Sequence, residues 1–544
     1  MGWCGLVGWR GRGRGAISEG MTYLAAPIGV REAGDLAAAL AQARAGGAEM
    51  IELRLDYLAH PSAEECRVMV AEAKRTGLPV VATCRAAGEG GRFAGSEEER
   101  EDLLEAVLGA EPDYVDVELA TWGRWSDARR RRWAARPRQL ILSSHDFAGL
   151  PGDLGERVRA LCATPAAVVK VAYTAQSLEE AFAALDVLHE GAGGKGLAAL
   201  AMGEAGSITR LLAKKLGAFL TFASLERGAE SAPGQGTLAE MRGVYRWEAV
   251  GPQTRVLGVI GRPVGHSLSP ALHNAAFAAT GYDGIYLPLD VGAGYEHFRA
   301  AVEGLRGRPW LHVRGLSVTL PHKENALRWL EEAGGTVEAP ARRIGAVNTI
   351  VFESDGGVRG YNTDYAGALE ALGEKLPGGR AGLGGMSAAV IGAGGVARAI
   401  VAGLVDAGAV VTVFNRTAER ARQLAGEFGC RALPLEELGR QEARLLVNAT
   451  SVGMHPKAEA AAVDSCCLRP GMMVFDTVYN PARTRLLREA EEAGATVVDG
   501  VSMFVNQAAG QFERFTGRAA PKDLMRRVVE GLLREGAGGA ARES

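Results

Sequence analysis

The residues best suited to chemistry lie where short apolar runs of the sequence end, and two of them form a reactive pair. Lys170 lies inside the apolar run 168–172 (VVKVA), and His145 follows the apolar run before it. Burial disfavours the charged form of an amine and leaves its nitrogen nucleophilic. A nucleophilic lysine beside a histidine base is what imine-forming catalysis needs. The alternatives are a lysine whose ammonium reaches solvent and a histidine buried for structural reasons.

Further polar residues follow the other apolar runs of the first half of the chain. They are Glu52, Arg54, Arg85, Glu89, Asp116, Glu118, Ser207 and Arg210. The runs themselves span residues 22–28, 50–57, 79–84, 114–119, 139–143, 167–172, 196–202 and 218–222. Helix-like stretches such as 63–76 and 97–108 separate them, and strands that alternate with helices build a parallel sheet. Eight such units predict a closed (β/α)8 barrel with polar chemistry at the carboxyl ends of its strands. An open sheet of eight strands is the alternative.

A glycine-rich turn in the second half has the context of a dinucleotide site. The apolar run 388–391 leads into the G-x-G-x-x-A pattern and then into a predicted helix at 398–407. Such glycines allow close approach of a pyrophosphate at the helix N-terminus. The pattern consists of Gly392, Ala393, Gly394, Gly395, Val396 and Ala397.

The strand predicted next, at 410–414, favours NADP over NAD. An NAD site places Asp or Glu after this strand to bind the ribose 2′-hydroxyl. Here Asn415, Arg416 and Thr417 follow it, with Arg420 close by. A cation at this position favours a 2′-phosphate, and the alternative is a solvated arginine.

Two more pairs could do chemistry between residues 255 and 364. Ser267 and Ser269 precede a helix predicted at 271–280, where they could hold a carboxylate. The alternative is that Ser269 is the N-cap, with Pro270 at the first helical position. Lys323 follows the run 317–321, and Asp364 follows the segment 360–363, so the two could form a charged pair. Alternatively, both are solvated loop residues.

Composition limits the class of protein. The chain has 544 residues, a formal net charge of -3 and 47% hydrophobic residues. This length predicts three to four domains, and the charge balance argues against a nucleic-acid or membrane-surface partner. The arginine run 129–132 fits a solvated helix face better than a site for an acidic partner. No run approaches the roughly 20 apolar residues of a membrane span.

The seven cysteines and nine histidines show no metal-binding spacing, so no metal is expected. Scattered free thiols indicate a reducing compartment, and we expect a cytoplasmic protein. Residues 1–20 have no apolar core of a secretory signal; they are a disordered extension, a segment upstream of a true start at Met21, or a transit peptide.

The first half of the chain resembles type I 3-dehydroquinate dehydratases across residues 22–245. The matching segments are IELRLDY, ATCRAAGEGG, SSHDF, VVKVAY, MGEAGSITR and SAPGQG. The resemblance implies that Lys170 forms an imine with the C3 ketone of 3-dehydroquinate. It implies that His145 moves protons, assisted by Glu89. It also implies substrate contacts from Glu52, Arg54, Arg85, Met202, Arg210, Ser231 and Gln235.

The second half resembles shikimate dehydrogenases across residues 256–530. The matching segments are GRPVGHSLSP, SVTLPHK, GAVNT, GYNTD, GAGGVARA, NRT, NATSVGM, DTVYNP and GVSMFVNQAAGQFERFTG. The resemblance implies that Lys323 transfers a proton with Asp364 as its partner. It implies substrate contacts from Ser267, Ser269, Thr319, Asn348, Asp364, Tyr479 and Gln507, and nicotinamide contacts from Asn448, Thr450 and Gly500. The family often has Phe where this chain has His322, and we expect that residue to lie behind the site and to affect its pH profile.

Together these features predict a bifunctional α/β enzyme of the shikimate pathway. We expect dehydration of 3-dehydroquinate to 3-dehydroshikimate, then reduction to shikimate with NADP as cofactor. The expected parts are a TIM barrel (21–246), a linker (247–254), a substrate-binding domain (255–363), a Rossmann domain (364–500), helices that return to the substrate-binding domain (501–534) and a disordered tail (535–544). The alternatives are a catabolic quinate/shikimate dehydrogenase that uses NAD, or a catalytically inactive sensor built from the same domains.

Overall fold

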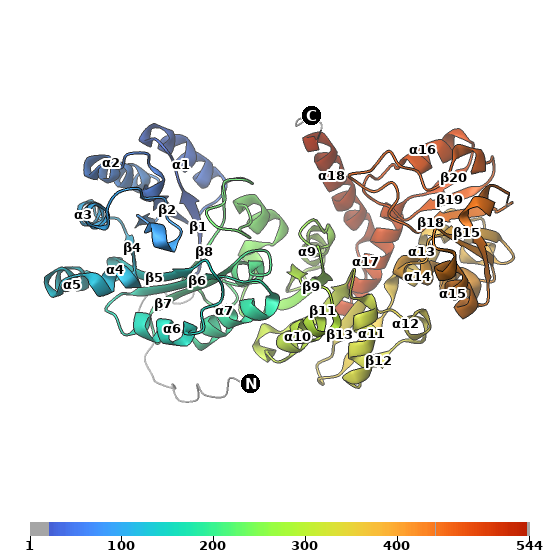
Figure 1. The fold of residues 1–544 in the computed structure, drawn as a ribbon, viewed down its shortest axis with the longest axis horizontal. Helices are drawn as coiled ribbons and strands as arrows, with labels where there is room; N and C mark the ends of the chain where they lie inside the picture. Colours follow the sequence, from blue (N-terminus) through green and yellow to red (C-terminus); the bar gives the residue numbers. More distant parts are fainter. Residues whose placement is uncertain (1–20, 441, 541–544) are drawn as a thin grey trace. The chain divides into compact units, whose positions relative to one another are not determined.

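The computed structural model describes residues 21–440 and 442–540. Its elements are drawn in Figure 1. The chain divides into two compact units, one made of residues up to 254 together with 289–291, and the other of the remaining residues from 255 onward. Within the described ranges, no helix is both long enough and apolar enough to cross a bilayer.

The first unit contains one sheet of eight parallel strands in the order β7-β6-β5-β4-β3-β2-β1-β8. The amide of Phe219, just before β8, donates to Leu197 O of β7 at 2.7 Å and links the two ends of the sheet. The predicted barrel is therefore confirmed over the open sheet. Its strands are β1 (Tyr23–Ile28), β2 (Met50–Arg54), β3 (Val80–Thr83), β4 (Tyr114–Glu118), β5 (Leu140–Asp146), β6 (Val168–Thr174), β7 (Gly196–Met202) and β8 (Leu220–Phe222).

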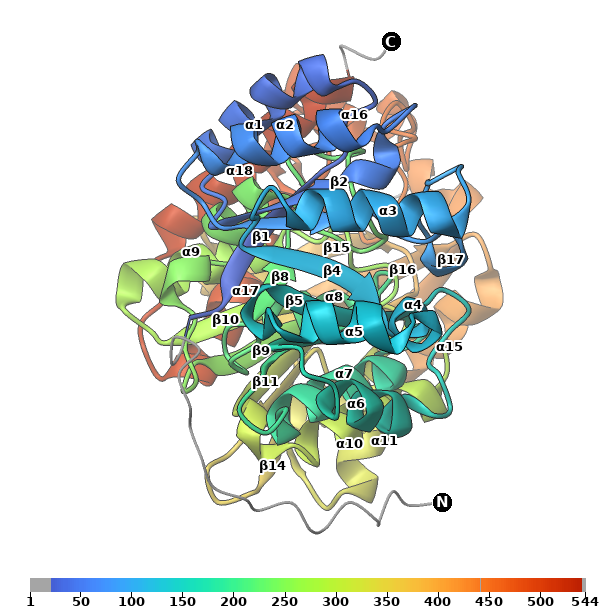
Figure 2. The same ribbon diagram turned by 90° about the vertical axis from the view of Figure 1, so that its left-hand side faces the viewer.

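Helices cover the outside of the barrel, as Figure 2 shows for α1 to α3 and α5 to α7. Serine N-caps set the starts of α2, α3, α5 and α7. α3 begins with a capping box between Ser96 and Glu99, where the sequence predicted its start. The helices are α1 (Leu36–Ala45), α2 (Ala63–Lys74), α3 (Glu97–Leu108), α4 (Leu119–Arg124), α5 (Asp127–Ala134), α6 (Leu154–Cys162), α7 (Leu178–Glu190) and α8 (Ser207–Leu211).

Two strands end at places that differ from the apolar runs. β2 stops at Arg54, because Arg54 binds Asp56 through two hydrogen bonds and the chain turns there. β5 continues past Ser143, because its polar end still pairs with β6 up to the pair Asp146 and Tyr173. Hydrogen bonding to a neighbouring strand thus extends β5 beyond its apolar residues and places His145 inside the strand.

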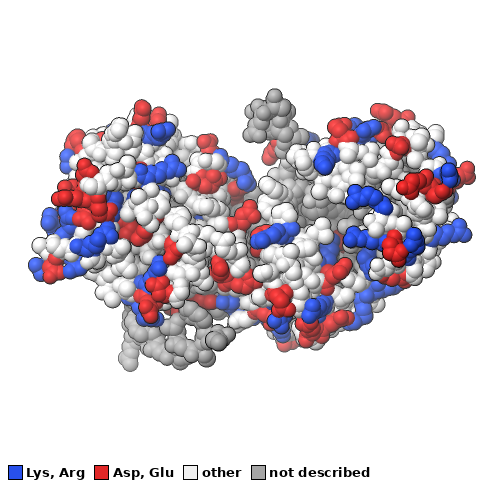
Figure 3. All heavy atoms as spheres, in the orientation of Figure 1, with Lys and Arg blue, Asp and Glu red and all other residues white. Residues whose placement is uncertain are grey.

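The arginine run 129–132 lies on α5, and the carboxylates that face it belong to α3. Arg129 pairs with Glu101, Asp102 and Glu105, and Arg132 also pairs with Glu105. Figure 3 shows acidic and basic side chains interspersed over the face that it draws. These arginines are therefore part of an ion-paired helix surface, close to the predicted solvated face.

The predicted linker at 247–254 is attached to the barrel. The Trp247 side chain is 1% exposed, and its Nε1 donates to Glu49 at 3.1 Å. Lys214 Nζ donates to Trp247 O at 2.9 Å, and Lys215 Nζ donates to Pro252 O at 2.8 Å. The predicted linker is thus held against the barrel by these hydrogen bonds and by the burial of Trp247.

The second unit begins with a mixed sheet in the order β10-β9-β11-β13-β14-β12. β9 and β11 are parallel, whereas β13 runs antiparallel to both β11 and β14. The carboxyl ends of β9, β11 and β14 and the amino end of β13 therefore meet at one edge. The strands are β9 (Arg255–Gly261), β10 (Gly284–Asp290), β11 (Val313–Val318), β12 (Thr336–Val337), β13 (Thr349–Phe352) and β14 (Val358–Tyr361). The helices are α9 (Ser269–Thr280), α10 (Tyr295–Arg306), α11 (Lys323–Glu332) and α12 (Ala339–Ile344).

A second sheet of six parallel strands follows in the order β17-β16-β15-β18-β19-β20. The strand order reverses between β15 and β18, which is where doubly wound folds bind nucleotides. The strands are β15 (Ser387–Ile391), β16 (Val410–Asn415), β17 (Arg431–Pro434), β18 (Leu445–Asn448), β19 (Met473–Asp476) and β20 (Thr496–Val498). The helices around it are α13 (Thr363–Gly373), α14 (Gly395–Asp406), α15 (Ala418–Phe428) and α16 (Arg485–Glu492).

The last two helices, α17 (Gly500–Thr516) and α18 (Lys522–Ala540), pack on the first sheet of this unit. Phe512 and Met525 share one buried cluster with Leu257 and Phe277. α18 continues to Ala540, past the end at Arg534 that the glycine-rich sequence predicted. The alanines among those glycines favour the helical backbone.

The docking of Trp247 predicts a measurable contribution to the stability of the barrel. Trp247→Ala removes a buried indole, which costs about 3–5 kcal/mol. At about 2–4 °C per kcal/mol for a domain of this size, calorimetry should show the first unit unfolding roughly ten degrees lower. Glu248→Ala in the same segment removes a side chain that is 59% exposed and should have little effect. Equal melting of the Trp247→Ala variant and the wild type would mean that 247–254 is a free linker.

Candidate active sites

The residues predicted for the first site line one cavity at the carboxyl end of the barrel. The predicted residues in this cavity are Glu52, Arg54, Arg85, Glu89, His145, Lys170, Met202, Arg210, Ser231 and Gln235. They come from six strands and the loops that follow them, so the barrel unites positions that are far apart in the sequence. The sequence did not identify the apolar part of the wall, which consists of Phe147, Ala172, Leu200 and Phe222.

Lys170 is buried and lies between two carboxylates. Its Nζ is 3.0 Å from Asp116 Oδ2 and 3.8 Å from Glu52 Oε1. On another side it lies 4.8 Å from the centroid of the Phe222 ring. The amine is thus 5% exposed, as the apolar run predicted, yet it is paired, which the sequence argument from burial alone did not foresee.

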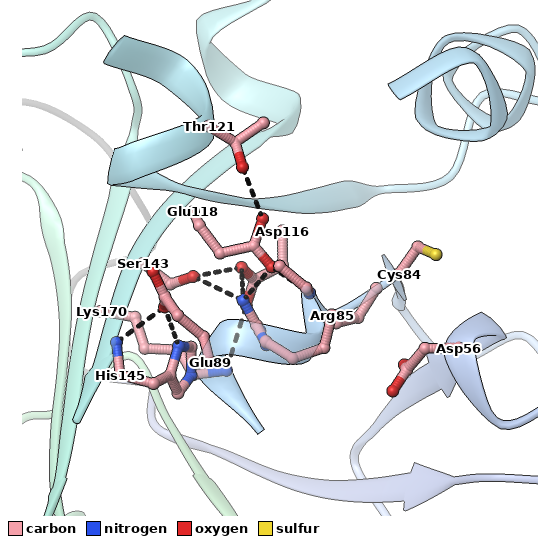
Figure 4. Close-up of polar contacts among 12 residues, drawn as sticks. Asp56, Cys84, Arg85, Glu89, Asp116, Glu118, Thr121, Ser143, His145 and Lys170 are labelled. Atoms are coloured by element: carbon pink, nitrogen blue, oxygen red, sulfur yellow. Dashed lines mark hydrogen bonds and ion pairs between the residues drawn. The ribbon is translucent and has the colours of Figure 1, made fainter. Parts of the chain in front are cut away.

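Arg85 binds the acidic residues behind this lysine (Figure 4). Its guanidinium donates to both oxygens of Asp116 at 3.1 and 2.8 Å, and to Glu118 at 3.0 Å. Burial opposes ionisation of Asp116, yet the charges of Arg85 and Lys170 hold the pKa of its carboxyl well below the usual range. Arg85 therefore keeps an anion beside Lys170, in addition to the substrate contact predicted for it.

His145 and Glu89 form a direct pair. Glu89 Oε2 lies 2.9 Å from His145 Nδ1 and accepts the backbone N–H of His145 at 2.8 Å. Burial, followed by repulsion from Arg85 and Lys170, lowers the pKa of His145 well below its usual value. Burial also raises the pKa of Glu89 to about 7. The imidazole is therefore neutral, and when Nδ1 carries its proton, Nε2 is free to accept another.

Arg210 is a buried cation without an anionic partner in the described structure. It is 3% exposed; Nη1 donates to Ala201 O at 2.8 Å, while Nε has no hydrogen-bond partner. Burial lowers its pKa to about 10. An unpaired buried guanidinium is costly, so the cavity fits a ligand that carries a carboxylate.

Asp116 is the carboxylate nearest to the amine of Lys170, and the sequence did not predict a role for it in the site. β4 is separated from β6 by β5, and alternation alone does not tell how far a side chain reaches across an intervening strand. The signal was present, because Asp116 and Glu118 are carboxylates inside an otherwise apolar strand. Buried carboxylates need cationic partners. The two carboxylates therefore predict ion pairs with nearby buried cations, here Arg85 and Lys170.

The second set of predicted residues meets at the edge of the mixed sheet. Thr319 follows β11, Asn348 precedes β13, and Asp364 follows β14. Because β13 is antiparallel, these three positions share the edge at which β9 also ends. Asn348 Nδ2 donates to Thr363 Oγ1 at 3.0 Å, which ties the two loops together.

Lys323 and Asp364 form an ion pair, with Nζ 2.5 Å from Oδ2. Their side chains are 14% and 9% exposed, so the solvated-loop alternative is wrong. Lys323 also lies near the glycine turn: a Cβ at Gly395 would meet its Cδ at 3.9 Å. His322, just before it, is fully buried, and its Nδ1 lies 3.0 Å from Asn325 Nδ2. The ring of His322 also packs near Phe298, with centroids 5.2 Å apart.

The structure changes the account of the two serines. Ser269 is the first residue of α9 and is buried, whereas the N-cap is Leu268, which makes no capping hydrogen bond. The alternative that Ser269 is the N-cap is thus wrong, because the helix begins one residue earlier than a serine cap requires. Ser267 Oγ accepts the Ser269 N–H at 3.3 Å.

The glycine turn has the shape needed for a dinucleotide. Gly392 has φ +118°, and a Cβ there would lie 2.9 Å from Ala449 O, so no side chain fits. A Cβ built at Gly394 would have no described neighbouring atom within 4 Å, so the backbone of this residue is open on that side. Gly394 is the N-cap of α14 and forms no side-chain cap, which leaves the first amides of that helix available to a phosphate. The residues present therefore fit a dinucleotide, and Ala393, Val396 and Ala397 complete the turn.

The end of β16 presents two cations. Arg416 and Arg420 are exposed, and within the described ranges neither makes an ion pair. Asn415 Nδ2 donates to Thr417 O at 2.9 Å and shapes the turn that carries Arg416. A 2′-phosphate is the anion that this turn fits.

The remaining predicted residues lie in the same unit on neighbouring elements. Tyr479 stacks on Phe504 with ring centroids 4.7 Å apart. Gln507 packs against Gly367 of α13, the helix that also carries Asp364. Asn448 is the last residue of β18, Thr450 lies in the loop that follows, and Gly500 begins α17. Their grouping rests on the elements that carry them.

The two sites define a class: a bifunctional α/β enzyme with a lysine-containing parallel barrel and a dinucleotide-binding dehydrogenase on one chain. Four family descriptions match in order. Type I 3-dehydroquinase matches residues 24–252, and the shikimate dehydrogenase substrate binding domain matches 259–350. Shikimate / quinate 5-dehydrogenase matches 379–477, and the shikimate 5′-dehydrogenase C-terminal domain matches 500–530.

One relative matches both halves of the chain, and others match the second half alone. The bifunctional 3-dehydroquinate dehydratase/shikimate dehydrogenase, chloroplastic, of Arabidopsis thaliana is 36% identical over 94% of this chain and 85% of the relative. The shikimate dehydrogenase (NADP(+)) of Methanothermobacter thermautotrophicus is 43% identical over 52% of this chain and 98% of the relative. The chain belongs to the family of bifunctional 3-dehydroquinate dehydratase/shikimate dehydrogenases.

The pair of Glu89 and His145 predicts a pH dependence of the barrel reaction. Because burial raises the pKa of Glu89 to about 7, its carboxylate forms only as the pH rises through about 7. The carboxylate holds the Nδ1 proton of His145, so kcat/KM for the dehydratase should rise through this range and then level off. In Glu89→Gln the rise near pH 7 should disappear and the plateau should fall about tenfold or more. The exposed Glu64→Gln serves as control; a pH profile left unchanged by Glu89→Gln would contradict the assignment.

Proposed function

We propose that the chain catalyses two consecutive reactions. The barrel dehydrates 3-dehydroquinate to 3-dehydroshikimate, and the second unit reduces 3-dehydroshikimate to shikimate with NADPH. The observation that carries the first reaction is the single cavity that contains a buried amine, a neutral imidazole and an unpaired guanidinium. The family membership of the whole chain supports both reactions.

In the barrel, the amine of Lys170 adds to the C3 carbonyl and water leaves, which gives a protonated imine. Nε2 of His145 takes the C2 proton, and the electrons of that C–H bond move into the imine. The resulting enamine expels the C1 hydroxyl, which takes the proton back from His145 and leaves as water. Hydrolysis of the imine then frees the product and restores Lys170. Glu89 holds the imidazole in the tautomer that these proton transfers need.

The rest of the cavity orients the substrate. Arg210 binds the carboxylate, because it is the guanidinium left without an anion. Glu52 and Arg54 bind hydroxyl groups, as do Arg85, Ser231 and Gln235 around the rim. Met202 forms the apolar floor. Asp116 stabilises the protonated imine through its position 3.0 Å from Lys170 Nζ.

In the second unit, the ion pair of Lys323 and Asp364 transfers the proton. Lys323 gives a proton to the carbonyl oxygen, and Asp364 holds the lysine side chain in place. Ser267 and Ser269 bind the substrate carboxylate, while Thr319, Asn348, Tyr479 and Gln507 surround the hydroxyl groups. NADPH, when bound, supplies the hydride.

The glycine turn and the end of β16 hold the cofactor. The amides of Gly394 and Gly395 bind its pyrophosphate, and Arg416 with Arg420 binds the 2′-phosphate. Asn448, Thr450 and Gly500 form the nicotinamide end. Shikimate dehydrogenases named for NADP(+) are among the relatives, which supports this choice over NAD.

Two alternatives are less well supported. A catabolic quinate/shikimate dehydrogenase that uses NAD would need a carboxylate after β16, where this chain has Arg416. An inactive sensor would tolerate loss of the reactive residues. Instead, Lys170 and His145 share one cavity, and Lys323 contacts its partner Asp364.

We also assign the parts of the chain and its compartment. The barrel comprises residues 21–246, the substrate-binding domain 255–363 and the Rossmann domain 364–500, with 501–534 returning to the substrate-binding domain. The segment 247–254 joins the two units. A cytoplasmic location agrees with the free thiols of the cysteines in the described part of the chain. The predictions for residues 1–20 and for the last residues of the tail, 541–544, fall outside the described residues.

The imine mechanism predicts a covalent product on one lysine. Borohydride added with 3-dehydroquinate should reduce the imine and add the mass of the bound ligand to the peptide that contains Lys170. Lys170→Ala should trap nothing and lose dehydration by several orders of magnitude. It should still reduce supplied 3-dehydroshikimate at near the wild-type rate, because the second site shares no residue with the barrel. An unchanged mass of the wild type after reduction would rule out the imine.

The cofactor assignment predicts a selective effect at Arg416. Loss of one partly solvated charge contact to a phosphate weakens binding about tenfold. Arg416→Ala should therefore raise the KM for NADPH about tenfold and leave the value for NADH nearly unchanged, with Arg420 retaining part of the preference. Arg431→Ala, an exposed arginine on the neighbouring strand, is a matched control. Equal use of NADH and NADPH by the wild type would favour the catabolic alternative.

A further inference from the structure

Asp476, at the carboxyl end of β19, is a buried carboxylate to which neither proposed reaction assigns a role. Its side chain is 1% exposed, and it lies directly opposite Asn448 in the β18–β19 ladder. Three neutral groups donate to it, and burial raises the pKa of the carboxyl. A buried carboxylate without a cation is costly, so its hydrogen bonds must do something that an apolar residue could not.

Those hydrogen bonds join two loops. Oδ1 accepts Asn448 Nδ2 at 2.9 Å and the backbone N–H of Val478 at 3.1 Å. One oxygen atom therefore links the loop after β18 to the loop after β19. Oδ2 accepts Thr484 Oγ1 at 2.6 Å, and Thr484 is the N-cap of α16, farther along the chain.

The amide of Asn448 in turn shapes its own loop. Its Nδ2 also donates to Val452 O at 3.1 Å, and its Oδ1 accepts Thr450 Oγ1 at 2.6 Å. An amide side chain can satisfy these groups only in one orientation. Because Asp476 accepts from Nδ2, it fixes that orientation and with it the course of residues 448–452.

The loop 448–452 borders the glycine turn, and the loop 477–479 borders the start of α17. A Cβ at Gly392 would lie 2.9 Å from Ala449 O, and a Cβ at Gly500 would lie 2.4 Å from Val478 O. Each loop is therefore packed closely against a glycine of a neighbouring element, which leaves it little room to shift. Tyr479, the next residue after Val478, lies in the second loop.

We propose that Asp476 is a positioning residue, which holds the loops 448–452 and 477–479 in the arrangement that receives the nicotinamide end of NADPH. It acts through Asn448 and Val478 and touches no substrate. This inference rests on the proposed function, since it assumes that the unit binds NADPH.

The test is a titration of NADPH fluorescence with the full chain in the absence of substrate. Asp476→Ala should weaken binding about tenfold, which corresponds to about 1.4 kcal/mol. Asp476→Asn should bind within about threefold of the wild type, because its amide oxygen can face Asn448 and Val478 while its NH2 group donates to Thr484 Oγ1. In both variants the dehydratase reaction should be unchanged.

Thr484→Val is the matched control, because it removes the hydrogen bond to Oδ2 of the same carboxylate and leaves the bonds of Oδ1 to Asn448 and Val478 in place. It should lower the melting temperature and leave NADPH affinity within about twofold. If Asp476→Ala does not fold, Asp476→Ser replaces it, since a serine hydroxyl is too short to reach both loops, and the same tenfold loss is expected.

Wild-type affinity in the folded Ala or Ser variant would overturn the proposal. So would an Asn variant as weak as the Ala variant, because that pattern would point to the negative charge itself. Failure of the wild type to bind NADPH would instead overturn the proposed function, and this inference with it.

Discussion

The charge cluster around Arg85 is the interaction on which the barrel site depends. This side chain begins after β3 and binds carboxylates of β4, one of which also contacts Lys170 of β6. The partners of a buried ion are expensive to remove, because each leaves an uncompensated charge. The amine is therefore held in place by neighbours that are themselves fixed, and not by its own apolar surroundings. Preorganisation of this kind lets the site respond to a developing positive charge without rearrangement.

The second unit gathers its reactive groups in a different way. A parallel sheet places the loops after its strands at one edge, but the mixed sheet adds the amino end of β13 to that edge, because β13 is antiparallel. Asn348 and Asp364, which come from the opposite ends of the β13–β14 hairpin, are thereby brought together. Lys323, at the start of α11, faces the same edge and also approaches the glycine turn. The direction of one strand thus decides which segments can share a substrate.

How much of this was predictable depends on whether a residue acts through its local sequence or through distant partners. Lys170 and His145 were predictable, because an ionisable residue in an apolar strand is visible in a short window. The role of Asp116 was not, since it depends on reach across β5 to a cation on another strand. For Ser269 the alternative of an N-cap was wrong: serine before proline is a common N-cap, yet α9 starts at that serine itself.

The segment 247–254 shows a further limit of sequence patterns. Its glycine and proline indicate a break in regular structure, and the break is real. Composition does not reveal that backbone carbonyls in such a segment can be bound by lysines, or that Trp247 is buried beneath it. A segment can lack regular secondary structure and still be bound firmly to a domain. Only the tertiary contacts of the segment show whether it is.

The buried guanidinium of Arg210 carries an electrostatic cost that the described protein groups do not offset. Its guanidinium is buried beside a carbonyl, with no anion to compensate it. The substrate that supplies a carboxylate also completes the protein, so part of the binding free energy is relief of an unfavourable state. Any ligand that binds only the folded form raises its stability by mass action. A carboxylate bound at Arg210 should therefore raise the thermal stability of the barrel as well as orient the ligand that carries it.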